Sequence, residues 1–147
     1  GGAPVPAELR QKARALLCDD VINGYGANEI GAICKLDSNR YGVLVPGIEL
    51  KIVDDNDNPL PIGEEGSIAL RSPGMVHSYW DQAEYSALYF RDGWFYPGDR
   101  GKLINPRVLH HLGRNDEVLN FGGVKYAPEL IENFFLKLIV VLKKFHQ

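Results

Sequence analysis

The chain has 147 residues, of which 45% are hydrophobic and 24% are charged, and its formal net charge is −3. This composition is typical of a globular protein of about one domain and excludes a disordered or fibrous chain. The 16 basic and 19 acidic side chains form no basic stripe, which argues against nucleic acid as a partner.

The first 31 residues predict a helix, a short strand and a glycine-rich loop. Helix formers run from Pro6 to Leu17 with apolar residues at helical spacing, and a proline often opens a helix. Val21 and Ile22 are typical of a short strand, which gives way to a loop in the segment GYGANEIG at residues 24–31. Such junctions often hold ligand sites.

The residues from Tyr41 to Arg114 predict a compact β-rich unit. Residues 41–54 and 66–72 alternate apolar and polar side chains, as half-buried strands do, and residues 55–66 are dense in turn formers. A helix is expected around Gln82 to Leu88. Short strands between turns follow in the segments GWFYPGD, residues 93–99, and GKLINPRVLHHLGR, residues 101–114.

The residues after Arg114 predict a second, smaller unit. They are typical of a two-stranded hairpin that turns near Gly122 and Gly123, followed by a helix that begins near Pro128. We therefore divide the chain into residues 1–114 and 115–147. The second part is too short to bury a core of its own.

The cysteines and histidines predict neither a disulfide framework nor a zinc site. Cys18 and Cys34 form no CxxC pair and have no nearby histidine at ligand spacing, which favours a reducing cytoplasm. His110 and His111 are adjacent, so on a strand they point to opposite faces and are not expected to share a metal. No apolar run reaches the roughly 18 residues of a membrane span. The first residue is Gly rather than Met, which indicates that the natural N-terminus is missing or was removed.

Four side chains have the chemistry of a nucleotide site. Tyr25, bracketed by glycines, offers a flat face to a base, and Glu29 shortly after it is a candidate magnesium ligand. Asp99 follows a glycine and is able to accept hydrogen bonds from two sugar hydroxyls, while Arg114 has donors for a ribose or a phosphate. Taken singly, each residue is better explained by a packed turn, an Asx-type turn or a solvated charge.

Four motifs in one order change this balance. They are GGAP at residues 1–4, GYGANE at 24–29, GWFYPGD at 93–99 and GRNDEVLNFGGVKYAPELIE at 113–132. Their order and spacing resemble the adenylate-forming superfamily, which includes acyl-CoA and aryl-CoA synthetases, luciferases and adenylation domains of peptide synthetases. The resemblance extends to about residue 135 and implies an α/β fold. Residues 1–114 then form the C-terminal part of the large AMP-binding domain, with a β-rich, distorted barrel-like subdomain, and residues 115–147 form the hinge and the beginning of the small C-terminal domain.

The resemblance also implies roles for individual residues. Glu29 is expected to act in catalysis by holding magnesium beside the phosphates, Lys125 to lie near the centre of the second half-reaction, and Asp116 to be the hinge. Asn28 stands where the family usually has Thr, and its amide is still able to donate to a phosphate. The nucleotide-binding residues implied in this way are Gly1, Gly2, Ala3, Tyr25, Gly26, Asn28, Asp99 and Arg114.

The reaction that the resemblance implies is activation of a carboxylate by ATP and magnesium. The resulting acyl-adenylate is attacked by the thiol of coenzyme A or of a carrier-protein phosphopantetheine arm. The family's glycine-rich phosphate loop and its catalytic lysine region are not found in these residues, and residues 137–147 depart from the family pattern. We therefore expect a fragment of an acid–thiol ligase that is inactive alone, with the remainder of the enzyme missing. The alternatives are a non-catalytic nucleotide-binding or protein-interaction module, or a relic that folds poorly.

Overall fold

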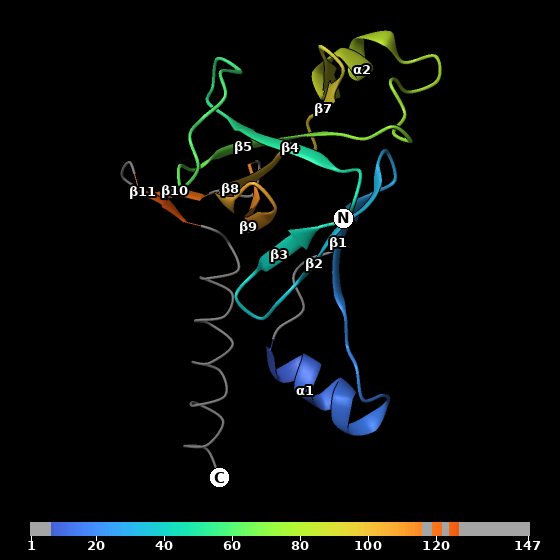
Figure 1. Cartoon of the computed structure of the whole chain (residues 1–147), viewed down its shortest axis with the longest axis vertical. Helices are drawn as coiled ribbons and strands as arrows, with labels where there is room; N and C mark the ends of the chain where they lie inside the picture. Colours follow the sequence, from blue (N-terminus) through green and yellow to red (C-terminus); the bar gives the residue numbers. More distant parts are fainter. Residues whose placement is uncertain (1–6, 116–118, 122–123, 127–147) are drawn as a thin grey trace. The chain divides into compact units, whose positions relative to one another are not determined.

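The computed structural model describes residues 7–115, 119–121 and 124–126, and the chain divides into two compact units, residues 1–112 and 113–147. Figure 1 labels the elements. The described helices are α1 (Ala7–Leu16) and α2 (Ala83–Tyr89). The strands of the larger sheet are β1 (Asn23–Ala27), β2 (Gly31–Leu36), β3 (Tyr41–Leu44), β4 (Glu49–Val53), β5 (Gly66–Arg71), β6 (Phe90–Arg91), β7 (Trp94–Phe95), β8 (Asp99–Asn105) and β9 (Val108–Arg114).

Among the described residues, nine strands form one sheet in the order β1-β2-β3-β9-β8-β5-β7-β6, with β4 paired to β5 off this path. The pairs β1 with β2, β2 with β3, β3 with β9, β5 with β8 and β4 with β5 are antiparallel. The sheet curls into a half-barrel (Figure 1). The predicted β-rich, barrel-like subdomain is therefore confirmed.

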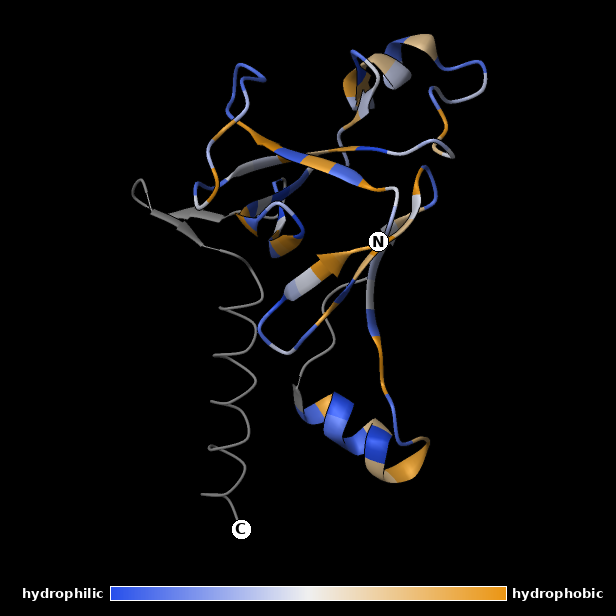
Figure 2. Cartoon of the chain, in the orientation of Figure 1, coloured by the Kyte–Doolittle hydropathy of each residue, from blue (hydrophilic) through white to orange (hydrophobic). Residues whose placement is uncertain are grey.

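The strands bury one set of their side chains in a common core. Successive residues of β9 are in turn partly buried and buried. Along β4 hydrophilic and hydrophobic residues alternate from Glu49 to Ile52, as Figure 2 shows, and its buried residues are Ile52 and Val53. Burial of a large aliphatic side chain contributes about 1.5–3 kcal/mol, so these side chains hold the sheet together. The largest fully buried ones are Ile33, Ile52, Ile68, Leu70, Leu109 and Val53.

Both predicted helices of the first unit are confirmed, whereas the prediction for residues 21–31 was wrong in its detail. Val21 and Ile22 precede the strand rather than form it, and β1 runs through the glycine-rich segment itself. The reason is antiparallel pairing with β2, which places Tyr25 opposite Cys34. This pairing holds the segment extended, although its two glycines have a low intrinsic preference for a strand. A turn at residues 28–30 then closes the hairpin.

In the second unit, β10 (Leu119–Phe121) pairs antiparallel with β11 (Val124–Tyr126), which confirms the predicted hairpin. The helix predicted from near Pro128 lies outside the described residues. The division into domains after residue 114 stays a prediction. Neither of the helices described above combines the length and the apolar character that a bilayer span requires.

Candidate functional site

A turn places Asp99 at the start of β8. Tyr96 and Pro97 before it are buried, and Gly98 has a φ of 80°, in the left-handed region that side chains disfavour. Asp99 itself is only 6% exposed. A carboxylate so deeply buried needs hydrogen-bond donors around it.

Tyr25 supplies one of these donors. Its hydroxyl donates to Asp99 Oδ2 over 2.7 Å, although the two residues are 74 positions apart in the sequence. Tyr25 lies on β1 and Asp99 on β8, and three strands separate these two in the sheet order. The contact therefore forms across the curled sheet and brings two of the predicted nucleotide-binding residues together.

His111 joins this pair from β9. Its ring centroid lies 4.4 Å from that of Tyr25, with the ring planes at 53°, and its Nε2 lies 3.8 Å from Asp99 Oδ2. On the other edge of the imidazole, Arg40 Nη2 lies 3.2 Å from Nδ1. The four side chains form one polar cluster, which we call the Asp99 cluster.

The sequence analysis missed the part that His111 plays in this cluster. His110 stacks instead on Tyr41, with ring centroids 4.2 Å apart and an angle of 17°, so the adjacent histidines do point to opposite faces. Burial lowers the pKa of His110 below its ordinary value. The two-residue period of a strand thus predicted that the two histidines lie on opposite faces. Only the pairing of β9 within the sheet shows which of them reaches Tyr25.

The close approach of β2 explains why position 26 of β1 is a glycine. The register of the β1–β2 pair shifts between Tyr25 and Gly26, as at a β-bulge, and a Cβ on Gly26 would lie 2.6 Å from the carbonyl oxygen of Gly31. A Cβ on Gly24 would meet nothing within 4 Å. Close packing of two strands therefore requires Gly26, while close approach of a ligand there stays a prediction.

Glu29 belongs to a second polar group, in the turn between β1 and β2. The Tyr79 hydroxyl donates to Glu29 Oε1 over 2.7 Å, and the Val76 N–H donates to the Glu29 carbonyl over 2.9 Å. Ser86 of α2 fixes Tyr79 in turn, because its Oγ accepts the Tyr79 N–H at 2.8 Å. Burial, followed by the nearby Glu29 carboxylate, raises the pKa of the Tyr79 hydroxyl above its ordinary value, so this hydroxyl remains a donor. Tyr79 was not predicted as a site residue.

The structure describes three of the remaining predicted residues. Asn28 is exposed in the same turn as Glu29, and Arg114 is partly buried at the end of β9. Lys125 lies on β11. In the part of the chain that the structure describes, no three or more His, Cys, Asp or Glu side chains gather as a metal site. The predicted residues that lie outside the described ones are Gly1, Gly2, Ala3 and Asp116.

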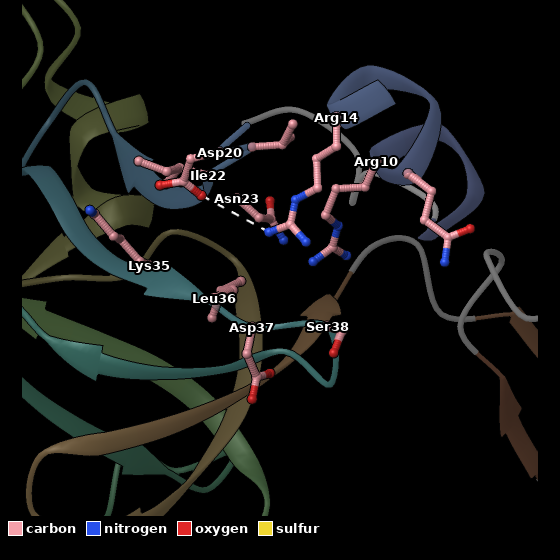
Figure 3. Close-up of a pocket in the computed structure, with 11 residues that line it drawn as sticks. Arg10, Arg14, Asp20, Ile22, Asn23, Lys35, Leu36, Asp37 and Ser38 are labelled. Atoms are coloured by element: carbon pink, nitrogen blue, oxygen red, sulfur yellow. Dashed lines mark ion pairs between the residues drawn. The ribbon is translucent and has the colours of Figure 1, made fainter. Parts of the chain in front are cut away.

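A hollow of about 440 Å³ is lined by α1, by residues 20–23 at and before the start of β1, and by residues 35–38 at and after the end of β2 (Figure 3). Its cationic side chains are Arg10 and Arg14 of α1 and Lys35 of β2, and Arg14 pairs with Asp20 at 4.0 Å. None of the predicted nucleotide-binding residues that the structure describes lines this hollow. The Asp99 cluster and the Glu29 group, rather than this hollow, are therefore the candidate site.

The motifs and the β-rich fold are similar to those of the adenylate-forming superfamily, and comparison of the sequence with known families agrees. Residues 1–80, more than half of the chain, match the family of AMP-binding enzymes. The chain therefore belongs to the AMP-binding enzyme family, and the predicted resemblance is confirmed.

Individual relatives give the same result. Mitochondrial acyl-coenzyme A synthetase ACSM5 of Homo sapiens is 29% identical over 154 residues, covering 97% of this chain and 27% of the relative. The structure of O-succinylbenzoate coenzyme A synthetase (MenE) from Bacillus subtilis in complex with AMP matches with a TM-score of 0.74 and 27% identity, covering 93% of this chain and 30% of that one. The amide bond synthetase McbA from Marinactinospora thermotolerans matches with a TM-score of 0.71 and 26% identity, covering 86% and 28%. The chain thus spans about a quarter of the length of the curated relatives that it matches.

Proposed function

We propose that this chain is part of an ATP-dependent ligase that activates a carboxylate as its acyl-adenylate and then transfers the acyl group to a thiol. Residues 1–114 supply adenine and ribose contacts, and residues 115–147 supply the hinge and the beginning of the small C-terminal domain. The chain alone is expected to bind nucleotide without completing the reaction, because it spans about a quarter of its relatives' length.

The hydrogen bond between Tyr25 and Asp99 carries this proposal. It joins two separate motifs of the sequence at one partly buried point, with a hydrogen bond on the carboxylate and the tyrosine ring beside it. A fixed carboxylate is suited to accept hydrogen bonds from both hydroxyls of a ribose, and an aromatic ring is suited to stack on adenine. Nucleotide binding is therefore the role that fits both side chains.

The reaction needs positioning more than it needs a catalytic base. A carboxylate oxygen of the substrate attacks the α-phosphorus of ATP, the bond from that phosphorus to the bridging oxygen breaks, and pyrophosphate leaves. Holding the adenosine firmly aligns the α-phosphate with the attacking oxygen, and such alignment lowers the barrier substantially. Tyr25 and Asp99 make this contribution in the proposed enzyme.

Glu29 fits the role of the magnesium ligand. Magnesium that accompanies a nucleotide is usually held by one or two carboxylates together with phosphate oxygens, so a single carboxylate is sufficient. Tyr79 holds one oxygen of Glu29 in place by a hydrogen bond. When bound, the ion neutralises charge on the phosphates, and the part of this chain is to orient the carboxylate that holds it.

Coenzyme A is the acceptor that we propose first, with a carrier-protein phosphopantetheine arm as the other thiol. The names of ACSM5 and MenE both specify a coenzyme A synthetase. The amide bond synthetase McbA marks the competing outcome, in which an amine takes the acyl group. Product analysis of the intact protein with coenzyme A and with amines separates these acceptors.

We propose the cytoplasm as the location. Both cysteines are free thiols, and Cys18 is exposed. An exposed free thiol is typical of a reducing compartment. Oxidation of Cys18 in the protein isolated from its native cells would contradict this assignment.

Calorimetric titration of the 147-residue chain with AMP tests the nucleotide site. Wild-type chain is expected to bind AMP, and Asp99→Ala to weaken binding at least about tenfold, because a hydrogen bond to a charged group contributes about 1.5–3 kcal/mol. Asp55→Ala is the matched control, since Asp55 is an exposed carboxylate in a turn of the same sheet. Folded Asp99→Ala protein that binds AMP as well as the wild type would contradict the proposal.

Pyrophosphate release by a longer protein that contains this chain tests the ligase itself. Release that depends on a carboxylate supports the ligase. Binding of AMP by the chain, combined with no release for any carboxylate tried, would instead leave the non-catalytic nucleotide-binding module.

A further inference from the structure

His111 contacts both side chains that the proposed function places on the nucleotide. It is 8% exposed, its ring packs on Tyr25, and its Nε2 faces Asp99 Oδ2 at 3.8 Å. That oxygen is the same one that accepts the Tyr25 hydroxyl. Two polar groups from different strands therefore converge on one carboxylate oxygen.

Arg40 determines which nitrogen of His111 carries the proton. A guanidinium has donors and no acceptor, so Nδ1 of His111, 3.2 Å from Arg40 Nη2, acts as the acceptor. In the neutral imidazole the proton then lies on Nε2, the nitrogen that faces Asp99. This Nε2 is buried and has no hydrogen-bond partner among the described residues. The Asp99 carboxylate is the negative group that this N–H faces.

The backbone also holds Arg40 against His111. Arg40 has a φ of 66°, a left-handed conformation that is uncommon outside glycine. The His111 N–H donates to the Arg40 carbonyl over 3.0 Å, and the Arg40 N–H donates to the Asp37 carbonyl over 3.2 Å. Arg40 and His111 are therefore joined both by a main-chain hydrogen bond and by a side-chain contact.

We propose that His111 is a positioning residue of the nucleotide site, which holds the Asp99 carboxylate in the orientation that receives the ribose hydroxyls. The inference rests on the function proposed above. His111 acts through Asp99 and needs no contact with the nucleotide. Its removal is therefore expected to weaken the hydroxyl contacts selectively.

The experiment compares two ligands of the 147-residue chain, AMP and 2′,3′-dideoxy-AMP, which lacks both ribose hydroxyls. His111→Phe keeps a ring against Tyr25 and removes the two nitrogens. We expect it to weaken AMP at least about tenfold and to leave 2′,3′-dideoxy-AMP unchanged. His111→Gln, which returns an N–H donor on a side chain of similar reach, is expected to restore most of the affinity for AMP.

His110→Phe is the matched control, because His110 is adjacent on β9 but stacks on Tyr41 instead. It is expected to change neither affinity. Equal weakening of both ligands by His111→Phe, or no weakening of either, would overturn the positioning role while the proposed function stands. Equal affinity of the wild-type chain for AMP and 2′,3′-dideoxy-AMP, or no binding of AMP, would overturn the ribose role of Asp99 and the inference together. Circular dichroism of each variant verifies that it is folded.

Discussion

Replacing Tyr25 with phenylalanine removes one hydroxyl and leaves the ring in place. In the wild type this hydroxyl donates over 2.7 Å to a carboxylate that is 6% exposed, so the variant removes one hydrogen bond from a buried charge. Hydrogen bonds to charged groups contribute about 1.5–3 kcal/mol, and we expect the free energy of unfolding to fall by about 2 kcal/mol. With a urea m-value of about 2 kcal/mol/M, the unfolding midpoint then falls by about 1 M.

Urea unfolding followed by circular dichroism measures this shift, and Tyr41→Phe supplies the comparison. Tyr41 lies at the surface of the same sheet and stacks its ring on His110, a contact that phenylalanine retains. Tyr41→Phe is expected to change the free energy of unfolding by less than about 0.5 kcal/mol. If Tyr25→Phe shifts the midpoint no further than Tyr41→Phe does, the Tyr25 hydroxyl does not stabilise Asp99 and the reasoning about this cluster is refuted.

Three further predictions concern the strand packing, a thiol and the magnesium ligand. Gly26→Ala is expected to lower the free energy of unfolding by about 1–3 kcal/mol in the same urea assay, because its Cβ would lie 2.6 Å from a carbonyl oxygen. Gly24→Ala is the control and is expected to be neutral or slightly stabilising, because a Cβ there would meet nothing within 4 Å. Burial raises the pKa of the Cys34 thiol to about 11, so at pH 8 we expect only the exposed Cys18 to react rapidly with Ellman's reagent. Rapid reaction of a second thiol in the folded protein would contradict this. Glu29→Gln is expected to abolish the gain in ATP affinity that magnesium gives the wild type and to leave AMP affinity unchanged in calorimetry; a gain that persists would argue against Glu29 as the ligand.

Periodic patterns predicted much of the fold. The helices at Ala7–Leu16 and Ala83–Tyr89 and the alternating strands were visible because each carries enough residues to reveal its period. The segment around Tyr25 was misread, since two glycines weaken any strand signal and the extended conformation depends on pairing with β2. The pairing of β1 with β2 cannot be predicted from the strand propensity of these residues alone.

For the site, sequence motifs selected Tyr25 and Asp99, and the structure brings them into contact. The residues that support them were not predictable. His111 and Arg40 belong to no motif, and their positions follow from the pairing of β3 with β9. Tyr79 was likewise hidden, because its contact with Glu29 spans 50 residues. Supporting residues of this kind depend on topology more than on local sequence.

The 74-residue separation between Tyr25 and Asp99 also bears on how this protein folds. Chains rich in such non-local contacts fold slowly, typically in milliseconds to seconds, because the loop must close before the contact is gained. In the sheet, β2, β3 and β9 lie between β1, which carries Tyr25, and β8, which carries Asp99. No short peptide from either motif alone is able to present both groups, because the two motifs meet only through the sheet. A ligand that binds both side chains therefore requires the assembled sheet.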